Sequence, residues 1–435
     1  MTLLLPLLLS LLPPSLGVLA ISIGTSDGTM RKGVEINTDI APLYPDFRPL
    51  MPKDKLLMVQ VVWRHGDRAP TMTYPTDVHQ EDAWPLGWGE LTPLGMRQQY
   101  ALGQVIRKRY INGTHDFISA RYTPREIFIR STDVNRTLIS AYSNIAGMFS
   151  TGKEGEDYPE YLRWPSSWTP VPVHTQAVES DYEGNIFAPC GRADELSDQL
   201  RASEEYKKLE EDNADLLEYL SEKTGMKVDL TNIYLINDAH FIENIYNMTQ
   251  PAWFTPKVTE RLLNLTRSSN EFVYGIGKPY SPELIKLRGG SMLKSINDVF
   301  RLKLDCHLGK DKTNCAWIAP LKYYAYSAHD TTVSALLATF GDERRVIRGG
   351  LPHYTASVAL ELWHLEDIGP AVKILFHGAF HHNYHTITHL TKGCPENDEF
   401  CPFKTFTARS SKFEPVNIAK ECRRRVPIET NRVPV

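Results

Sequence analysis

An apolar run that ends abruptly in charged side chains constrains this 435-residue chain more than any other feature. The run covers residues 56–62, and the segment RHGDR follows at 64–68. Such a run is typical of a buried strand, and open α/β sheets bind ligands at the carboxyl ends of their strands. Arg64 and Arg68 flank His65, and two guanidinium groups beside one imidazole repel each other unless an anion lies between them. The stretch therefore predicts an anion site that His65 contacts.

Two further predicted strands end in charged or titratable residues. The apolar segment 127–129 ends at Arg130, and the aromatic segment 321–327 is followed by Ala328, His329 and Asp330. Because a doubly wound sheet brings its strand ends to one crevice, we expect these side chains to converge with the first group. The predicted site then contains Arg64, His65, Arg68, Arg130, His329 and Asp330.

Local signals place helices directly after these strands. Thr92 can cap a helix that has Pro93 at its first position. Ser131 or Thr132 can cap the helix that follows Arg130, where a helix N-terminus would also favour an anion. Gly341 is expected to end the helix that follows Asp330.

The middle of the chain has a different character from its two flanks. Sheet-like segments occupy 54–150 and 305–422, whereas 151–304 is mainly helical, with a charged helical stretch at 197–223. We therefore predict an α/β core with a doubly wound, mostly parallel sheet flanked by helices. The segment 151–304 is predicted to be a helical cap inserted into this core.

The N-terminus indicates export. Residues 2–22 are almost wholly apolar, and small residues favour cleavage after Ala20, so we interpret 1–20 as a signal peptide. An uncleaved membrane anchor is the alternative, because the run approaches spanning length. No other segment is apolar enough to span a membrane, and we expect no stable span after cleavage. The net charge of −4 gives no reason to expect nucleic acid as a partner.

Cysteines and glycosylation sequons point to the same compartment. An even number of cysteines suggests three disulfides in an exported chain, although six buried thiols are the alternative. The cysteines are Cys190, Cys306, Cys315, Cys394, Cys401 and Cys422. Of the four N-x-[ST] sequons, those at Asn112, Asn247 and Asn264 are the better candidates, because Asn135 lies in a helix beside the predicted site.

Two other groups of polar residues are candidates for a metal site or for local hydrogen bonding. Five histidines, which are His377, His381, His382, His385 and His389, resemble a metal cluster. Their spacing is irregular and lacks cysteines or carboxylates, so we interpret them as a strand end and a loop and expect no metal. Asp238 and His240 in the predicted cap are expected to make local hydrogen bonds.

The charged strand ends resemble those of a known family. RHGDRAP at 64–70 matches the RHGxRxP signature of the histidine acid phosphatases, which form branch 2 of the histidine phosphatase superfamily. RSTDVNRTLISA at 130–141 and YSAHDTTVSALL at 326–337 are similar to further segments of that family, as is the Gly289-Gly290 pair. The resemblance to the prostatic and lysosomal acid phosphatases covers about residues 54–422.

This resemblance implies an acid phosphatase that acts on small phosphate monoesters. It implies that His65 attacks phosphorus to form a phosphohistidine and that Asp330 donates the proton to the leaving group, as the residue chemistry allows. The other four residues then hold the phosphate: Arg64, Arg68, Arg130 and His329. Arginines neutralise the charge in this scheme, so no cofactor is expected.

The resemblance carries further expectations. It favours a Cys190–Cys422 disulfide, while short loops favour Cys306–Cys315 and Cys394–Cys401. It implies a secreted or lysosomal protein. Relatives form dimers, which allows a homodimer here, although nothing in the sequence requires one. A phytase-like or lysophospholipid phosphatase of the same family stays an alternative, as does a catalytically silent glycoprotein.

Overall fold

The computed structural model describes residues 49–425, apart from residues 114, 166, 311, 314, 348–350 and 379–382. The signal peptide predicted at 1–20 lies outside the described residues. No helix in the described part of the chain is long and apolar enough to cross a membrane.

The described residues form one seven-stranded sheet with the order β2-β3-β1-β4-β5-β6, and β7 pairs with β5. The strands are β1 (Lys55–Arg64), β2 (Ile127–Ser131), β3 (Tyr323–Ala328), β4 (Ser357–Leu365), β5 (Gly369–His377), β6 (His385–Thr386) and β7 (Cys401–Pro402). β2, β3 and β1 are parallel, and the other pairings are antiparallel. The predicted α/β class is confirmed, with its parallel part confined to the three strands that end in the predicted site residues.

Strand register brings the charged strand ends to one edge. Arg64 at the end of β1 lies opposite Ala328 at the end of β3, and Ser131 at the end of β2 lies opposite Ser327. All of β1 after its first residue is buried, as expected for a central strand. The residues that follow β1 and β3 therefore emerge side by side.

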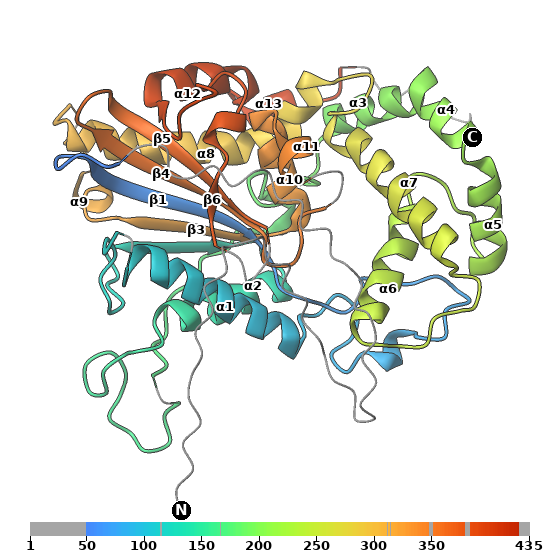
Figure 1. Ribbon diagram of the computed structural model, residues 1–435, viewed down its shortest axis with the longest axis horizontal. Coiled ribbons are helices and arrows are strands. Elements are labelled where there is room, and N and C mark those ends of the chain that lie inside the picture. The colour runs from blue at the N-terminus through green and yellow to red at the C-terminus, as the bar shows by residue number, and fades with distance from the viewer. Residues whose placement is uncertain are drawn as a thin grey trace, which may run out of the picture. The chain divides into compact units, whose positions relative to one another are not determined.

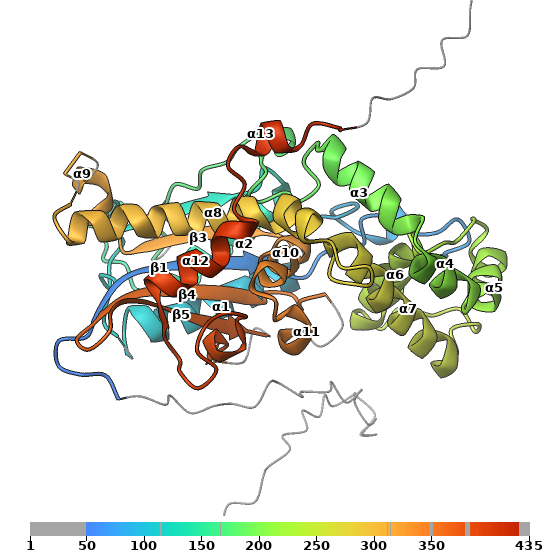
Figure 2. The same cartoon turned by 90° about the horizontal axis from the view of Figure 1, so that it is seen from above.

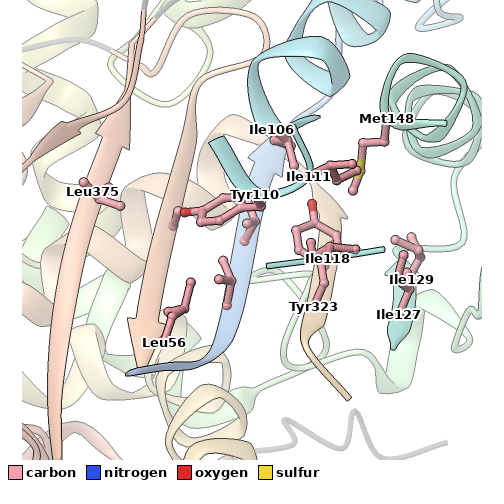
Figure 3. Close-up of a cluster of buried hydrophobic side chains, with 14 of the residues drawn as sticks. Leu56, Ile106, Tyr110, Ile111, Ile118, Ile127, Ile129, Met148, Tyr323 and Leu375 are labelled. Atoms are coloured by element: carbon pink, nitrogen blue, oxygen red, sulfur yellow. The ribbon is translucent and has the colours of Figure 1, made fainter. Parts of the chain in front are cut away.

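Helices cover both faces of the sheet, as Figures 1 and 2 show. One face packs on α1 (Pro93–Tyr110) and α2 (Asn135–Met148), and the other on α8 (Pro282–His307), α10 (Asp330–Phe340) and α12 (Phe403–Ser410). On the first face, Ile106 and Tyr110 of α1 and Met148 of α2 meet strand residues such as Ile129 and Tyr323 (Figure 3). This continuous apolar layer fixes the sheet against the two helices.

The helix boundaries test the predicted caps. Thr92 accepts a hydrogen bond from the Gly95 amide with Pro93 at the first helical position, and Gly341 ends α10 with a left-handed φ of +76°, so both predictions are confirmed. The predicted cap at Ser131 or Thr132 is wrong, because α2 begins at Asn135 after Val134. The Thr132 hydroxyl contacts His329 instead, at 3.0 Å.

The segment between α2 and β3 contains six long helices among its described residues. They are α3 (Gly191–Arg201), α4 (Glu204–Glu211), α5 (Ala214–Thr224), α6 (Ile233–Ile245), α7 (Pro256–Tyr274) and α8. The single helical stretch predicted at 197–223 is wrong. Ser203 caps a new helix, α4, by accepting a hydrogen bond from the Tyr206 amide, and a further helix, α5, begins at Ala214. The helices α3–α7 lie beyond the end of the sheet toward which β1 and β3 point (Figure 1).

The described chain also contains short helices and three disulfides. Four of these helices are 3-10 helices: η1 (Glu81–Ala83), η2 (Val178–Ser180), η3 (Thr388–Leu390) and η4 (Ser411–Phe413). The short α-helices are α9 (Cys315–Ile318), α11 (Glu343–Val346) and α13 (Ile418–Glu421). The disulfides join Cys190 to Cys422, Cys306 to Cys315 and Cys394 to Cys401. The first of them ties the start of α3 to the C-terminal segment across 232 residues of sequence.

Candidate active site

A cavity of about 830 Å³ lies where the strand ends meet the helices of the 151–304 segment. His65 and Asp330 line it, together with Arg64, Arg68 and His329. The structure therefore brings together five of the six residues that the sequence predicts. Residues of α6 and α7 form much of the remaining wall. A volume of this size is typical of a small-molecule site.

His65 is buried and held in one tautomer. Its Nδ1 lies 2.7 Å from the Gly66 carbonyl oxygen, and a carbonyl can only accept, so Nδ1 carries the proton and donates. Nε2 of the neutral ring then has a free lone pair. Burial lowers the pKa of His65 well below its usual value, and the charges of Arg64 and Arg136 lower it further. The imidazole stays unprotonated, and therefore nucleophilic, under acidic conditions.

The backbone after His65 is wedged against helix α1. A Cβ atom at Gly66 would lie 2.2 Å from the Gly95 carbonyl oxygen, so only glycine fits. The next residue, Asp67, accepts from the hydroxyl of Thr92 at 2.5 Å and from the hydroxyl of Tyr246. Asp67 therefore joins the loop to α1 and to the segment after α6, as a supporting residue outside the cavity lining.

Arg64 and Asp330 form a buried ion pair at the centre of the site. Arg64 Nη2 lies 2.9 Å from Asp330 Oδ2, and Arg64 Nη1 donates to the Pro352 carbonyl at 2.6 Å. Burial raises the pKa of Asp330, but the charges of Arg64 and Arg68 outweigh that effect, and its pKa lies below the usual value. Asp330 is consequently a stronger acid than an ordinary aspartic acid.

Arg68 connects the strand edge with helix α6. Its Nη1 and Nη2 donate to the two carboxylate oxygens of Asp238 at 2.8 and 3.1 Å. The prediction that Asp238 makes local hydrogen bonds is therefore wrong. A bidentate pair of this kind fixes the plane of the guanidinium group. His240 does bond locally, to Gln250 at 2.5 Å.

Arg130 is the predicted site residue that does not line this cavity. Its Nη2 donates to Asp181 at 2.6 Å and to Gln176 at 3.0 Å, and its Nη1 donates to Glu183. Two carboxylates therefore already neutralise it. These partners lie about fifty residues further along the chain, so its strand-end position alone did not reveal them.

Arg136, which sequence reasoning missed, occupies the place expected for Arg130. It lies in the first turn of α2 and lines the cavity with His65 and Arg68. It makes no hydrogen bond or ion pair within the described chain, and its buried Nε has no partner. Burial and the charge of Arg68 lower its pKa to about 10. The sequence did contain a signal for Arg136. A cation in the first turn of a helix is opposed by the helix macrodipole, so its presence there indicates a functional role.

His329 forms the remaining edge of the site. Its Nε2 lies 3.0 Å from the Thr132 hydroxyl, and its ring centroid lies 5.7 Å from that of His65. Burial and the charge of Arg136 lower the pKa of His329 to about 3, so the ring is neutral. A neutral imidazole beside three guanidinium groups adds a hydrogen-bonding group without adding repulsion.

The histidines near residue 380 give no metal centre among the described residues, where no group of three potential metal-binding side chains occurs. His381 and His382 lie outside the described residues. His377 ends β5 and His385 begins β6.

Comparisons with known proteins agree with this geometry. The family model for the histidine phosphatase superfamily (branch 2) matches residues 55–377. The chain is 33% identical over 370 residues to lysosomal acid phosphatase of Bos taurus, covering 84% of this chain and 80% of that protein. It is 34% identical over 368 residues to prostatic acid phosphatase of Bos taurus, covering 83% and 86%.

Solved structures share the fold. A phytase of Hafnia alvei in complex with myo-inositol hexakis sulphate superposes with a TM-score of 0.60 at 15% identity, covering 87% of this chain and all of that one. A phytase of Citrobacter braakii gives a TM-score of 0.60 at 16% identity, covering 85% and 99%. At these identities the likeness concerns the fold alone.

Proposed function

The chain belongs to branch 2 of the histidine phosphatase superfamily, and on that premise we propose that it is an acid phosphatase that hydrolyses phosphate monoesters through a phosphohistidine intermediate. One observation carries the proposal. Arg64, Arg68 and Arg136 all line the cavity around His65, and the Nε of each is buried without a partner in the described structure. Three unused guanidinium donors around one imidazole fit a tetrahedral anion.

The first chemical step is transfer of the phosphoryl group to His65. With the phosphate oxygens held by the three arginines and by His329, Nε2 of His65 attacks phosphorus and the ester P–O bond breaks. The leaving alkoxide takes the proton of Asp330, which lies beside Arg64 at 2.9 Å. The products of this step are an alcohol, a phosphohistidine and an Asp330 carboxylate.

The second step returns the enzyme to its starting state. The Asp330 carboxylate accepts a proton from a water molecule, which attacks phosphorus as the P–N bond breaks. Inorganic phosphate leaves, and Asp330 is again protonated. In this assignment His65 and Asp330 are catalytic. Arg64, Arg68, Arg136 and His329 bind phosphate, and Arg130 is structural.

An acidic pH optimum follows from the lowered pKa values of Asp330 and His65. The lowered pKa of Asp330 means that its proton-donating form is populated only at low pH. The lowered pKa of His65 keeps the nucleophile unprotonated there. Bound phosphate adds negative charge, which raises the pKa of Asp330 toward the working range.

The remaining expectations concern the whole protein. The exposed sequon residues Asn112, Asn247 and Asn264 and the three disulfides support a secreted or lysosomal glycoprotein. We retain the division into a core of 54–150 and 305–422 and a cap of 151–304, in which α8 is the helix that packs on the sheet. A homodimer stays part of the proposal.

The test is turnover of 4-nitrophenyl phosphate by the purified chain across the pH range, with and without vanadate, which mimics transferring phosphate. We expect a rate that peaks in the acidic range and that vanadate inhibits. A folded protein without turnover at any pH would instead support a catalytically silent glycoprotein.

A further inference from the structure

A second set of arginines lines the same cavity. Arg201 of α3, Arg267 of α7 and Arg288 of α8 belong to its wall, and the proposed hydrolysis uses none of them. Helices, rather than strand ends, position all three. They form a separate group that requires its own explanation.

Arg288 is the most constrained of the three. Its side chain is buried, with 9% of the residue exposed. Nη1 donates to the Ile186 carbonyl at 2.6 Å, and the guanidinium carbon lies 4.8 Å from the ring centroid of Phe187. These contacts hold the guanidinium group in the cavity wall, while its buried Nε has no partner in the described structure.

Arg288 also lacks a counterion among the described residues. The carboxylate whose charge it senses most is Asp194, but the ion pair of Asp194 is with Arg424 at 3.8 Å. Burial lowers the pKa of Arg288, and the positive charge of Arg201 lowers it further. A buried cation without a hydrogen-bonded anion is costly, and its partner is then to be sought in a ligand.

Neighbouring residues support a polar subsite with an apolar approach. Thr266 lines the cavity, and its hydroxyl is buried without a partner in the described chain. Arg267 forms no ion pair with the described residues, and its Nε is also buried without a hydrogen-bond partner. Phe241 and Leu263 line the cavity as well and are partly exposed, which suits a carbon chain between two polar ends.

Tyr274 connects this group to the proposed catalytic centre. Its phenol senses the charges of Asp330, Arg288 and Arg64, so it lies within electrostatic range of both groups. One extended substrate can therefore place its scissile phosphate at His65 and a second group near Arg288.

We propose that Arg288 forms an accessory anion subsite, and that preferred substrates carry a second phosphate or carboxylate on the leaving alcohol. This inference rests on the proposed phosphatase function. It concerns only the leaving group, because the scissile phosphate is held by the other arginines.

The test compares kcat/KM for α,ω-alkanediol bisphosphates of increasing length with kcat/KM for the monophosphates of the same diols. ω-Phosphorylated carboxylates form a second arm that distinguishes the two kinds of anion. A symmetric bisphosphate carries two equivalent phosphates, so a ratio of about two needs no subsite; we expect the ratio to exceed about ten and to peak at one chain length. Arg288→Gln should reduce the peak ratio about tenfold, the effect of one charge-assisted contact, while Arg288→Lys should retain part of it.

The matched control is Arg301→Gln, on the same helix, whose guanidinium pairs with Asp298 and Glu414 and does not line the cavity. It should leave the ratio unchanged. A ratio of about two or less in an enzyme that hydrolyses monophosphates would overturn the subsite and leave the phosphatase proposal intact. A purely structural Arg288 would reduce both rates equally, which would also overturn it.

A binding measurement keeps the inference testable without turnover. Calorimetry with non-hydrolysable α,ω-bisphosphonates and monophosphonates should show tighter binding of the bisphosphonate to the wild-type chain. Arg288→Gln should remove that advantage. Equal affinities for the two ligands in the wild-type chain would contradict the subsite, whatever the activity assays give.

Discussion

Two sets of three arginines line the cavity, and the two sets are held in different ways. At the strand edge, Arg64 and Arg68 are tied to Asp330 and Asp238, so their guanidinium planes are fixed and only selected donors stay free. At the helical wall, Arg288 is fixed by a backbone carbonyl and an aromatic ring and has no counterion in the described structure. The comparison suggests that the strand edge provides the chemistry, whereas the helical wall selects the substrate.

The largest expected effect is loss of the nucleophile at the strand edge. His65→Ala should reduce kcat by roughly four orders of magnitude or more, because the covalent route is removed. The reduction should be the same for mono- and bisphosphates, since both share the chemical step. The measurement is kcat for both substrate classes, with circular dichroism to show that the variant folds. Near-normal turnover would mean that the nucleophile is another residue.

The next effect separates the acid from the anion-binding residues. Asp330→Asn removes the proton donor but keeps a side chain of the same size beside Arg64. We expect alkyl phosphates, which have poor leaving groups, to lose about 10²–10⁴-fold in kcat and nitrophenyl phosphate to lose far less. A linear free-energy plot against leaving-group pKa measures this. Equal losses across the series would contradict the role of Asp330 as the acid.

The third effect compares two arginines six positions apart. Arg136→Gln should reduce kcat/KM by about 10²–10³-fold, because one preorganised donor is lost from the transition state. Arg130→Gln should mainly reduce stability, because it leaves the buried carboxylate of Asp181 unpaired. Kinetics and thermal melts on both variants check this. An activity loss for Arg130→Gln and only a stability loss for Arg136→Gln would instead indicate that Arg130 binds the phosphate.

The smallest effect concerns a buried acid in the helical segment. Burial and the hydrogen bond with Asp77 raise the pKa of Glu243 to about 8. The folded state therefore keeps a proton that the unfolded state releases above about pH 4. The resulting stability is complete below that pH and is lost as the pH rises through about 8.

Buried histidines titrate in the opposite sense, so this prediction is made as a difference between variants. Glu243→Gln, which mimics the protonated acid, should match the wild-type melting temperature at about pH 5 and exceed it by at least about 2 °C at about pH 8. Burial also raises the pKa of Asp342, in the core, to about 8. Asp342→Asn is therefore a second variant for the same comparison of melting temperatures. A difference that does not change with pH would rule out a shared proton at Glu243.

Local signals in the sequence were sufficient for much of the fold and for one end of the site. The buried strand before Arg64, the Thr92-Pro93 cap and the Gly341 stop follow from short-range rules and agree with the structure. Strand register then brings His65 and Asp330 together, as a parallel sheet requires. These features depend on residues close to one another in the sequence.

Long-range partners were not accessible in the same way. Arg130 forms ion pairs with Asp181 and Glu183, and Arg68 forms one with Asp238. These pairs depend on how the 151–304 segment packs against the sheet edge. The first break in the 197–223 stretch depends on Ser203, which is a cap in one context and an ordinary helix residue in another. Arg136 shows its position in the first turn of a helix in the sequence, but its neighbours in the cavity, His65 and Arg68, are recognised only in three dimensions.

The most direct test of the central claim is the position of the phosphoryl group on the enzyme. The chain is quenched in alkali during turnover, because phosphohistidine survives there, and is examined by ³¹P NMR and peptide mapping. We expect phosphate on Nε2 of His65, since the Nδ1 proton is donated to the Gly66 carbonyl. Phosphate on Nδ1, or on another residue, or its absence from an actively turning-over enzyme, would contradict the account.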